Sequence, residues 1–318
     1  MRCLIINADG YGFTEGTTRA IQECIEFGTV RSISANVNFP YVRGLRDLVK
    51  RYPFLSVGCH LNPIVGRPVL PIREVRSLVD RDGNFLYKNF ARKFRRREID
   101  TGELRRELMA QIERTRDLAG DCFSHVDFHM GLHRLPRLYP LFLEVAAASG
   151  TGRVRTHRYF VGVESRYPRL RHAAYMFGSG RRLSGSLWNF FLRKWARLRG
   201  FAMPDYALVI THMTTDAEVL SLDNYVQMVR NTPKGYSEFV AHPAYVDAEL
   251  RRWSVYIDSR VEEHKVLLDP RFREALERGP TRLAGYRDIP LRGLKELQAS
   301  TGCQRRPASG PSSLGEQQ

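Results

Sequence analysis

Short apolar runs alternate with helix-like stretches along most of this chain, and this alternation limits the folds that it can form. The runs at 3–6, 55–62 and 237–245 have the length of buried strands and end in polar or turn-forming residues. Between them, 17–28 and 101–119 carry apolar residues at helical spacing. Strands that alternate with helices usually pair in parallel and carry the helices outside the sheet. The pattern predicts an α/β protein.

The remaining predicted elements continue this alternation. We expect further strands at 30–39, 123–130, 152–160 and 206–213, and further helices at 41–53, 136–150 and about 216–230.

Three segments depart from the alternation. The stretch 63–86 is rich in proline and glycine, which predicts an excursion over the functional site. The stretch 160–205 is irregular, basic and aromatic, and we interpret it as an insertion within one domain over 1–298. The polar tail 299–318 is predicted to be disordered.

The first apolar run leads directly into a carboxylate flanked by glycine, in the sequence Asn7-Ala8-Asp9-Gly10-Tyr11. In parallel α/β folds the carboxyl ends of the strands carry the functional site, which would place Asp9 where ligands bind. An alternative is that Asp9 caps the helix that begins near Thr14, since aspartate is favoured at that position.

Histidines also occur at predicted strand ends. Side chains two residues apart on a strand share a face, so His125, Asp127 and His129 are expected to point the same way. His60 and His242 end two other predicted strands. Imidazoles with carboxylates are typical ligands of divalent metals, so the pattern favours a metal site over structural histidines.

The chain is strongly basic, with 50 Lys and Arg against 34 Asp and Glu, a net charge of +16. Many of the arginines cluster in 90–107 and 181–200. Such a charge predicts attraction to polyanions, although solvated basic helix faces would give the same composition. A nucleic-acid partner is disfavoured, because no helix-turn-helix, zinc-finger or RNA-recognition pattern is present.

The five cysteines show no regular spacing and lie mostly in apolar contexts, which is typical of reduced thiols. No apolar run approaches the length of a membrane span, and the first run is too short for a signal peptide. We therefore expect a cytoplasmic protein. The oligomeric state stays open, a homodimer included.

Seven motifs follow one another along the chain: INADGYG (6–12), GCHLNPIVGRPVLP (58–71), SLVDRDGNFL (77–86), HVDFHMGLHRLP (125–136), EFVAHPAYVDAELR (238–251), LLDPRFREAL (267–276) and LAGYRDI (283–289). Together they resemble the YdjC/ChbG family of carbohydrate deacetylases, including its hopanoid-biosynthesis-associated branch. The resemblance implies a distorted (β/α) barrel of the polysaccharide-deacetylase type. It also implies metal-dependent removal of the acetyl group from an N-acetylated amino sugar, with a lipid-linked glycan as one candidate substrate.

The resemblance assigns roles to individual residues. It implies that His60 and His129 bind one divalent ion, Mg²⁺ or Zn²⁺, and that Asp9 and His242 act in catalysis. A bound cation polarises the amide carbonyl, a carboxylate accepts the proton of water, and an acid protonates the departing amine. Further residues within the motifs are assigned to support of the site (His125, Asp127 and Asn62) and to substrate binding (Arg67 and Tyr11).

One departure from the family pattern concerns the metal. The family usually carries two adjacent aspartates where this chain has Asp9 and Gly10. Asp9 is then either the base, with one metal ligand missing, or itself a ligand helped by Asp127. A third alternative is weak binding by two histidines and water. The chain could also be a catalytically weakened member that binds a glycan or scaffolds a pathway.

The segment 187–201 combines aromatic and basic residues. If it is helical, an apolar stripe forms with cations beside it, a pattern that suits a helix lying on an anionic membrane. The stripe consists of Leu187, Phe190, Phe191, Trp195 and Leu198. Two interpretations stay open: the stripe packs on the protein's own barrel and the arginines are solvated, or the helix makes peripheral contact with the inner membrane face.

Overall fold

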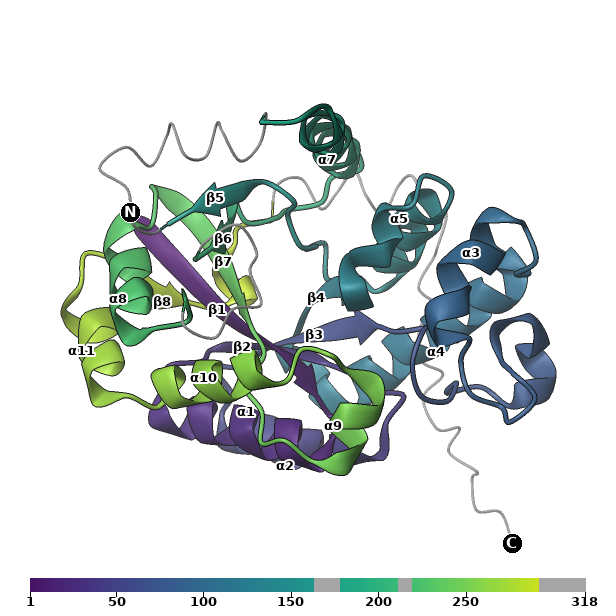
Figure 1. Ribbon diagram of the computed structural model, residues 1–318, viewed down its shortest axis with the longest axis horizontal. Helices are drawn as coiled ribbons and strands as arrows, with labels where there is room; N and C mark the ends of the chain where they lie inside the picture. Colours follow the sequence, from purple (N-terminus) through teal and green to yellow (C-terminus); the bar gives the residue numbers. More distant parts are fainter. Residues whose placement is uncertain (163–177, 211–218, 292–318) are drawn as a thin grey trace, which may run out of the picture.

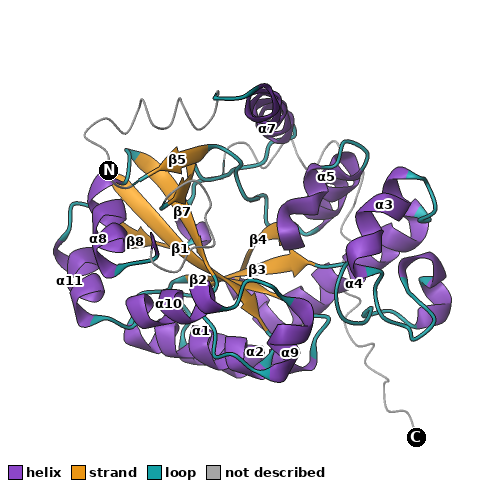
Figure 2. Ribbon diagram, in the orientation of Figure 1, coloured by secondary structure: helices purple, strands orange, loops and turns teal. Residues whose placement is uncertain are grey.

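A parallel eight-stranded sheet forms the centre of the protein, and helices surround it (Figures 1 and 2). The computed structural model describes residues 1–162, 178–210 and 219–291. The strands are β1 (Arg2–Tyr11), β2 (Ser32–Ala35), β3 (Ser56–Leu61), β4 (Phe123–Phe128), β5 (Tyr159–Val161), β6 (Tyr206–Val209), β7 (Gly235–Ala241) and β8 (Arg282–Ala284). The predicted α/β class is confirmed, and the predicted tail at 299–318 lies outside the described residues.

Ten described α-helices cover the sheet or flank it. They are α1 (Glu15–Phe27), α2 (Leu45–Arg51), α3 (Phe90–Arg95), α4 (Thr101–Ala119), α5 (Leu138–Ala148), α7 (Gly180–Leu198), α8 (Leu222–Asn231), α9 (Ala248–Trp253), α10 (Asp258–Leu267) and α11 (Pro270–Arg278). In Figure 1, α1, α2, α9 and α10 lie below the sheet, and α5 and α7 lie above it.

The strand order is β4-β3-β2-β1-β7-β6-β5, and β8 pairs with the first residues of β1. Among the described residues the ladder does not close into a complete ring, since β4 and β5 are its two ends. Single bridges, Val126 with Val154 and Arg153 with Ala202, extend the β4 end. The structure is therefore an open, distorted form of the expected barrel.

The first strand is longer than the sequence predicts. Instead of ending at Ile6, β1 continues through Tyr11, because Asn7 to Ala8 pair with β7 and Asn7 to Tyr11 pair with β2. Polar side chains on this part of the strand are satisfied internally: Asn7 accepts a hydrogen bond from Ser32 at 2.6 Å. The helix cap is Thr14, whose side chain accepts from the Thr17 amide, so Asp9 is not an N-cap.

A bulge near the end of β1 separates Asp9 from Tyr11. The pairing with β2 shifts register between these residues, and Gly10 lies in the left-handed region at φ +108°. Side chains two apart normally share a face. Here the bulge turns Tyr11 into the core between sheet and helices, where its hydroxyl accepts a hydrogen bond from Gln22 at 3.3 Å.

The predicted excursion at 63–86 is held on α4. Glu107, buried in α4, accepts hydrogen bonds from the amides of Val69 and Leu70 at 2.9 and 3.0 Å. Glu103 accepts from the Ser77 amide at 2.7 Å. The segment is thus tied beside the sheet, which corrects the expectation that it lies over the functional site.

The described part of the predicted insertion at 160–205 is mostly one regular helix, α7. Trp195 does not belong to its exposed stripe, because its ring contacts Tyr139 with centroids 5.7 Å apart. The other four predicted stripe residues are exposed: Leu187, Phe190, Phe191 and Leu198. The alternative that the stripe packs on the protein itself therefore applies to Trp195 and not to these four exposed side chains.

Candidate active site

A cavity of about 540 Å³ lies at the carboxyl ends of the strands. Four predicted site residues from different strand ends line it: Asp9 on β1, and His60, His129 and His242 at the ends of β3, β4 and β7. Aromatic and aliphatic side chains make up much of the remaining wall, among them Phe13, Phe128, Tyr159, Leu208, Trp253 and Tyr256.

Arg155 forms the electrostatic centre of this cavity. Its guanidinium binds both oxygens of Asp9, with Nη1–Oδ2 at 2.8 Å and Nη2–Oδ1 at 2.6 Å. Nη2 also lies 2.7 Å from Asp127 Oδ2, and Nε lies 2.9 Å from Glu238 Oε1. Bidentate guanidinium–carboxylate pairs are strong and directional, so Arg155 fixes the orientation of Asp9.

The three carboxylates respond differently to this arrangement. Burial acts to raise the pKa of Asp9, but the charge and hydrogen bonds of Arg155, together with the charges of His60 and His242, outweigh it and hold that pKa well below the ordinary value. The pKa of Asp127 is shifted in the same direction, again mainly by Arg155. For Glu238, burial dominates and raises the pKa to about 7 despite Arg155. Asp9 and Asp127 are therefore ionised at neutral pH.

His60 and His129 point ring nitrogens at each other, with His60 Nε2 and His129 Nδ1 3.2 Å apart. The other nitrogen of His60 lies 2.9 Å from Asp127 Oδ1, a carboxylate–imidazole contact that typically orients metal ligands. Burial, with His60 nearby, lowers the pKa of His129 to about 3, which leaves its imidazole neutral. Ligand atoms of Asp9, His60 and Asp127 lie within 4.8 Å of one another.

These contacts fit a divalent metal ion. Nitrogen ligands bind zinc at about 2.0–2.1 Å, so two nitrogens sharing one ion lie slightly more than 3 Å apart. His60 and His129 already have that spacing without any ion between them. Asp9 is near, although both of its oxygens bind Arg155. A carboxylate oxygen has two lone pairs, so this pairing does not exclude Asp9 as a further ligand.

His242 faces the same cavity and is held from α10. Its backbone amide donates to Glu263 Oε2, and its Nδ1 lies 3.9 Å from the same oxygen. Tyr256 donates to the other oxygen of Glu263 at 2.8 Å. Burial and then the Arg260 charge lower the pKa of His242 to about 3, and burial raises the pKa of Glu263 to about 7.

The loop after His242 is fastened to the beginning of α1. The Gly16 amide donates to Asp247 Oδ2 at 2.9 Å, and the Tyr245 amide donates to the Gly16 carbonyl at 3.2 Å. Gly16 is required here because an added Cβ would overlap the Tyr245 carbonyl oxygen. The chain segments that carry Asp9 and His242 are thus joined directly.

Five other predicted residues do not line the cavity. Asp127 is fully buried and contacts His60 Nδ1 at 2.9 Å. Arg67 lies in the exposed part of the 63–86 segment and donates to the Asp82 carbonyl at 2.8 Å. Tyr11 is in the core, as the bulge dictates. Asn62 organises its own loop by accepting from the amides of Ile64 and Val65, both at 3.1 Å. His125 lies deeper in the sheet interior, stacked on Tyr286 with centroids 3.7 Å apart.

Several cavity residues escaped the sequence analysis. They are Arg155, Arg260 and Glu263, together with His133 and His157, whose Nε2 atoms lie 2.8 Å apart. Glu238, which the analysis also did not select, does not line the cavity but pairs with Arg155. The alternation that placed His125 and Asp127 on one face would also have selected Glu238, which lies four residues before His242. Arg155 carried no comparable signal, because it follows a bridge and not a regular strand.

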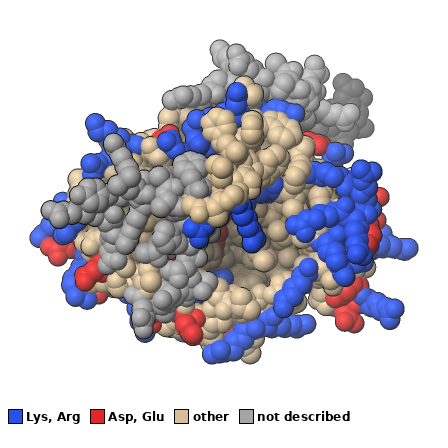
Figure 3. Space-filling model, turned by 45° about the horizontal axis from the view of Figure 1, so that its top comes forward, with Lys and Arg blue, Asp and Glu red and all other residues tan. Residues whose placement is uncertain are grey.

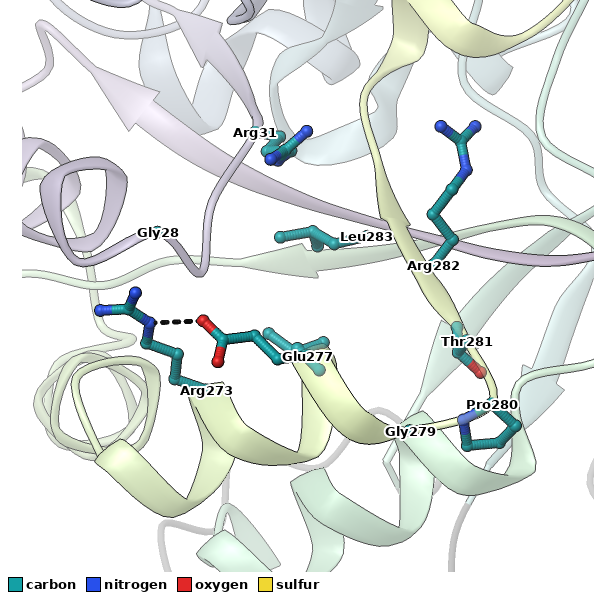
Figure 4. A pocket seen from close by; sticks show the side chains of 10 residues that line it. Gly28, Arg31, Arg273, Glu277, Gly279, Pro280, Thr281, Arg282 and Leu283 are labelled. Carbon is teal, nitrogen blue, oxygen red and sulfur yellow. Dashed lines mark hydrogen bonds and ion pairs between the residues drawn. The ribbon is translucent and has the colours of Figure 1, made fainter.

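A second hollow of about 560 Å³ lies at the opposite ends of the strands (Figure 4). It is lined by residues around the end of α1 and the α11–β8 connection, and Arg273 pairs with Glu277 there at 2.8 Å. The hollow holds neither histidine nor a carboxylate cluster. The histidines and Asp9 found in the cavity around Arg155 therefore have no counterpart in this hollow.

The protein is thus an open parallel α/β sheet with two ionised carboxylates, Asp9 and Asp127, beside the imidazoles of His60 and His129 at the carboxyl ends of its strands. A family model described as YdjC-like protein matches residues 3–278, and the chain belongs to this family.

Relatives and a solved structure agree with this membership. A carbohydrate deacetylase of Geobacillus stearothermophilus is 29% identical over 290 residues, which are 91% of this chain and 98% of that protein. A chitooligosaccharide deacetylase of Enterobacter sp. (strain 638) is 27% identical over 288 residues, 91% and 99% of the two chains. The crystal structure of an Enterococcus faecalis protein described as a cellobiose-phosphate cleavage protein superposes with a TM-score of 0.65 at 25% identity, covering 90% of this chain and 97% of that one.

Because Arg155 is the counter-ion of three buried carboxylates, we predict that its removal strongly lowers the stability of the protein. Arg155→Met should lower the free energy of unfolding by about 3–5 kcal/mol, because it leaves buried carboxylates without a counter-ion. The deficit should shrink as the pH falls towards 4. Without the guanidinium the pKa values of these carboxylates rise, so the folded variant takes up protons that the unfolded chain does not. Urea unfolding between pH 4 and 7 measures both effects.

Arg153→Met is the matched control for this experiment. Arg153 lies two residues away, and its guanidinium donates to the carbonyls of Ile289, Thr151 and Arg287. Its loss should cost less, about 1–2 kcal/mol, and should vary little with pH. Equal losses in the two variants, or a pH-independent loss for Arg155→Met, would contradict the assignment of Arg155 as the counter-ion.

Proposed function

We propose that this protein is a metal-dependent deacetylase that hydrolyses the acetamide of an N-acetylated sugar. The observation that carries the proposal is the convergence of Asp9, His60, His129 and His242, from four strand ends, on one cavity. Membership of the YdjC-like family and the names of the relatives, carbohydrate and chitooligosaccharide deacetylases, support this reaction.

His60 and His129 are proposed to hold the ion, with Asp9 as the third protein ligand available. A divalent ion at this position supplies polarisation of the amide carbonyl and activation of water. Two imidazole nitrogens suit zinc better than magnesium, which prefers oxygen ligands. Asp127 acts through His60, since its contact with Nδ1 at 2.9 Å turns Nε2 towards the cavity.

Asp9 and His242 are proposed to move the protons. Asp9 is ionised because of Arg155, as a proton acceptor must be. His242 is neutral in the resting cavity, so it has to gain a proton before it can protonate the amine. Glu263 Oε2 lies 3.9 Å from His242 Nδ1, and burial raises the pKa of this carboxyl to about 7. We propose that its ionised form stabilises His242 once the imidazole is protonated.

The proposed metal site predicts that metal content and activity fall together. Wild-type protein loaded with Zn²⁺ should hold one ion per chain and release acetate from N,N′-diacetylchitobiose. The His60→Ala, His129→Ala double variant should retain less than a tenth of the metal, and its turnover should fall about 10²-fold or more. Elemental analysis and an acetate assay measure both. Equal metal content in the two proteins would overturn the ligand assignment.

Gly10→Asp tests the alternative that the missing second aspartate weakens the chain. An added Cβ would meet only Phe13, at 3.9 Å, so there is room for a side chain. The backbone at φ +108° nevertheless disfavours it, by about 1–3 kcal/mol. If a ligand has been lost, the variant should bind Zn²⁺ at least tenfold more tightly and turn over faster despite lower stability. Unchanged zinc affinity, measured by competition with a chelator, would show that Gly10 does not weaken metal binding.

We further propose that the protein works on the surface of an anionic membrane, which would suit a lipid-linked substrate. Among the described residues, no helix is long and apolar enough to span a membrane. The proposed contact is the outer face of α7, where Leu183, Leu187, Phe190, Phe191 and Leu198 are between 41% and 76% exposed.

Charge on and around α7 supports this partner. The helix contains four arginines, one lysine and no acidic residue. In the face of the molecule drawn in Figure 3, Lys and Arg side chains greatly outnumber Asp and Glu around a central hollow. Apolar side chains with flanking cations suit the interface of an anionic bilayer, where each cation contributes about 1 kcal/mol.

Vesicle sedimentation tests the membrane surface. Wild-type protein should pellet with vesicles containing phosphatidylglycerol at low salt, and far less with pure phosphatidylcholine. Phe191→Glu should reduce the bound fraction about tenfold or more, because it replaces buried apolar area with a repelled charge. Phe54→Glu is the matched control, since Phe54 is 44% exposed in the α2–β3 connection. If Phe191→Glu binds as wild type does, α7 is not the membrane surface.

A further inference from the structure

Arg260 in α10 brings a second guanidinium into the cavity, and its surroundings differ from those of Arg155. Its side chain is only 8% exposed and lines the cavity together with Asp9, His129 and His242. Arg155 has three carboxylate partners, whereas within 1–162, 178–210 and 219–291 no acidic oxygen forms an ion pair with Arg260. The nearest acid, Glu263, directs its oxygens to the Tyr256 hydroxyl and the His242 amide.

The guanidinium is held in place from one side. Its Nε donates to the Tyr256 carbonyl at 2.8 Å, and the Arg260 backbone donates to Ile257 at 3.0 Å and accepts from Ala244 at 3.3 Å. Its Nη1 is buried and has no hydrogen-bond partner in the described part of the chain. A buried cationic donor without a partner is costly, so its retention points to a ligand oxygen that completes it.

The position of Arg260 relative to the histidines locates that ligand. Arg260 lines the same cavity as His242, the proposed acid, and His129, a proposed metal ligand. The bond to be hydrolysed has to lie between these two groups.

We propose that Arg260 binds the acetyl oxygen of the substrate as negative charge develops on it, and then binds the carboxylate of the acetate product. The proposal rests on the proposed function. An N-acetylated sugar is neutral, so an anionic oxygen first arises when water attacks. The water oxygen bonds to the carbonyl carbon, and the π electron pair moves onto the acetyl oxygen. Collapse of this intermediate breaks the C–N bond, the nitrogen takes a proton to leave as an amine, and acetate remains.

Preorganised donors act where charge appears, and loss of one typically lowers kcat by about 10²–10³. Arg260→Met removes the charge at nearly constant length. With zinc-loaded protein and N,N′-diacetylchitobiose, kcat should fall by this factor while KM changes less than about threefold, because the contact forms mainly in the transition state. The product inhibition constant for acetate should rise at least tenfold. Arg271→Met, at an exposed position on α11, removes the same charge and should leave all three constants unchanged.

A second variant and a binding measurement separate this role from a structural one. Arg260→Lys keeps a charge but loses the planar donor pair, so it should recover part of kcat and of acetate binding. Thermal melting in sodium acetate against sodium chloride of equal ionic strength needs no turnover. Acetate should raise the Tm of the wild type and not that of Arg260→Met.

The outcomes are distinct. If the wild type releases no acetate from any N-acetylated sugar, the proposed function fails, while an acetate-dependent Tm that requires Arg260 still supports an anion-binding site. If Arg260→Met raises KM with kcat unchanged, or binds acetate as the wild type does, Arg260 does not bind the developing anion and the proposal is overturned.

Discussion

The contact of Arg155 with Asp9, Asp127 and Glu238 is the interaction on which the site depends. A parallel sheet that carries several acids on its inner face could not bury them without a counter-ion, because like charges at this distance repel and desolvation disfavours each of them. One guanidinium offsets both the repulsion between the carboxylates and their desolvation, and it fixes Asp9 in a single orientation. It also helps to keep Asp9 and Asp127 ionised, whereas burial raises the pKa of Glu238 to about 7 despite Arg155.

The site is built in two halves with different purposes. On the β3–β4 side, Asp127 orients His60, which faces His129 at 3.2 Å. On the β7 side, α10 supplies Glu263 and Arg260 around His242. The first half, together with Asp9, holds the grouped donor atoms that could bind a metal, and the second holds Glu263, whose pKa burial raises to about 7. The proposed metal ligands His60 and His129 thus belong to one half of the cavity, and the proposed acid His242 and the anion-binding Arg260 belong to the other.

Sequence reasoning was most reliable where local pattern decides structure. The strand-and-helix alternation predicted the α/β class, and the two-residue period of a strand predicted that His125 and Asp127 share a face. It failed where tertiary contacts override the pattern. Tyr11 should have followed Asp9 into the site, but the bulge at Gly10 turned it into the core. Trp195 fits the apolar stripe of α7 by spacing, yet its ring packs on Tyr139. Arg155 and Arg260 could not have been chosen among so many arginines, because only the folded chain reveals which ones are buried.

The junction between Gly16 and the Asp247 loop has a consequence for biosynthesis. It joins the first helix of the chain, α1, to a loop more than 200 residues later in the sequence. His242, Arg260 and Glu263 leave the ribosome long after Asp9, so a growing chain carries Asp9, His60 and His129 before the residues that complete the cavity exist. Until α10 docks, the cavity lacks Arg260 and Glu263. Under the roles proposed above, a chain that ends before α10 would be inactive even if its first half had folded.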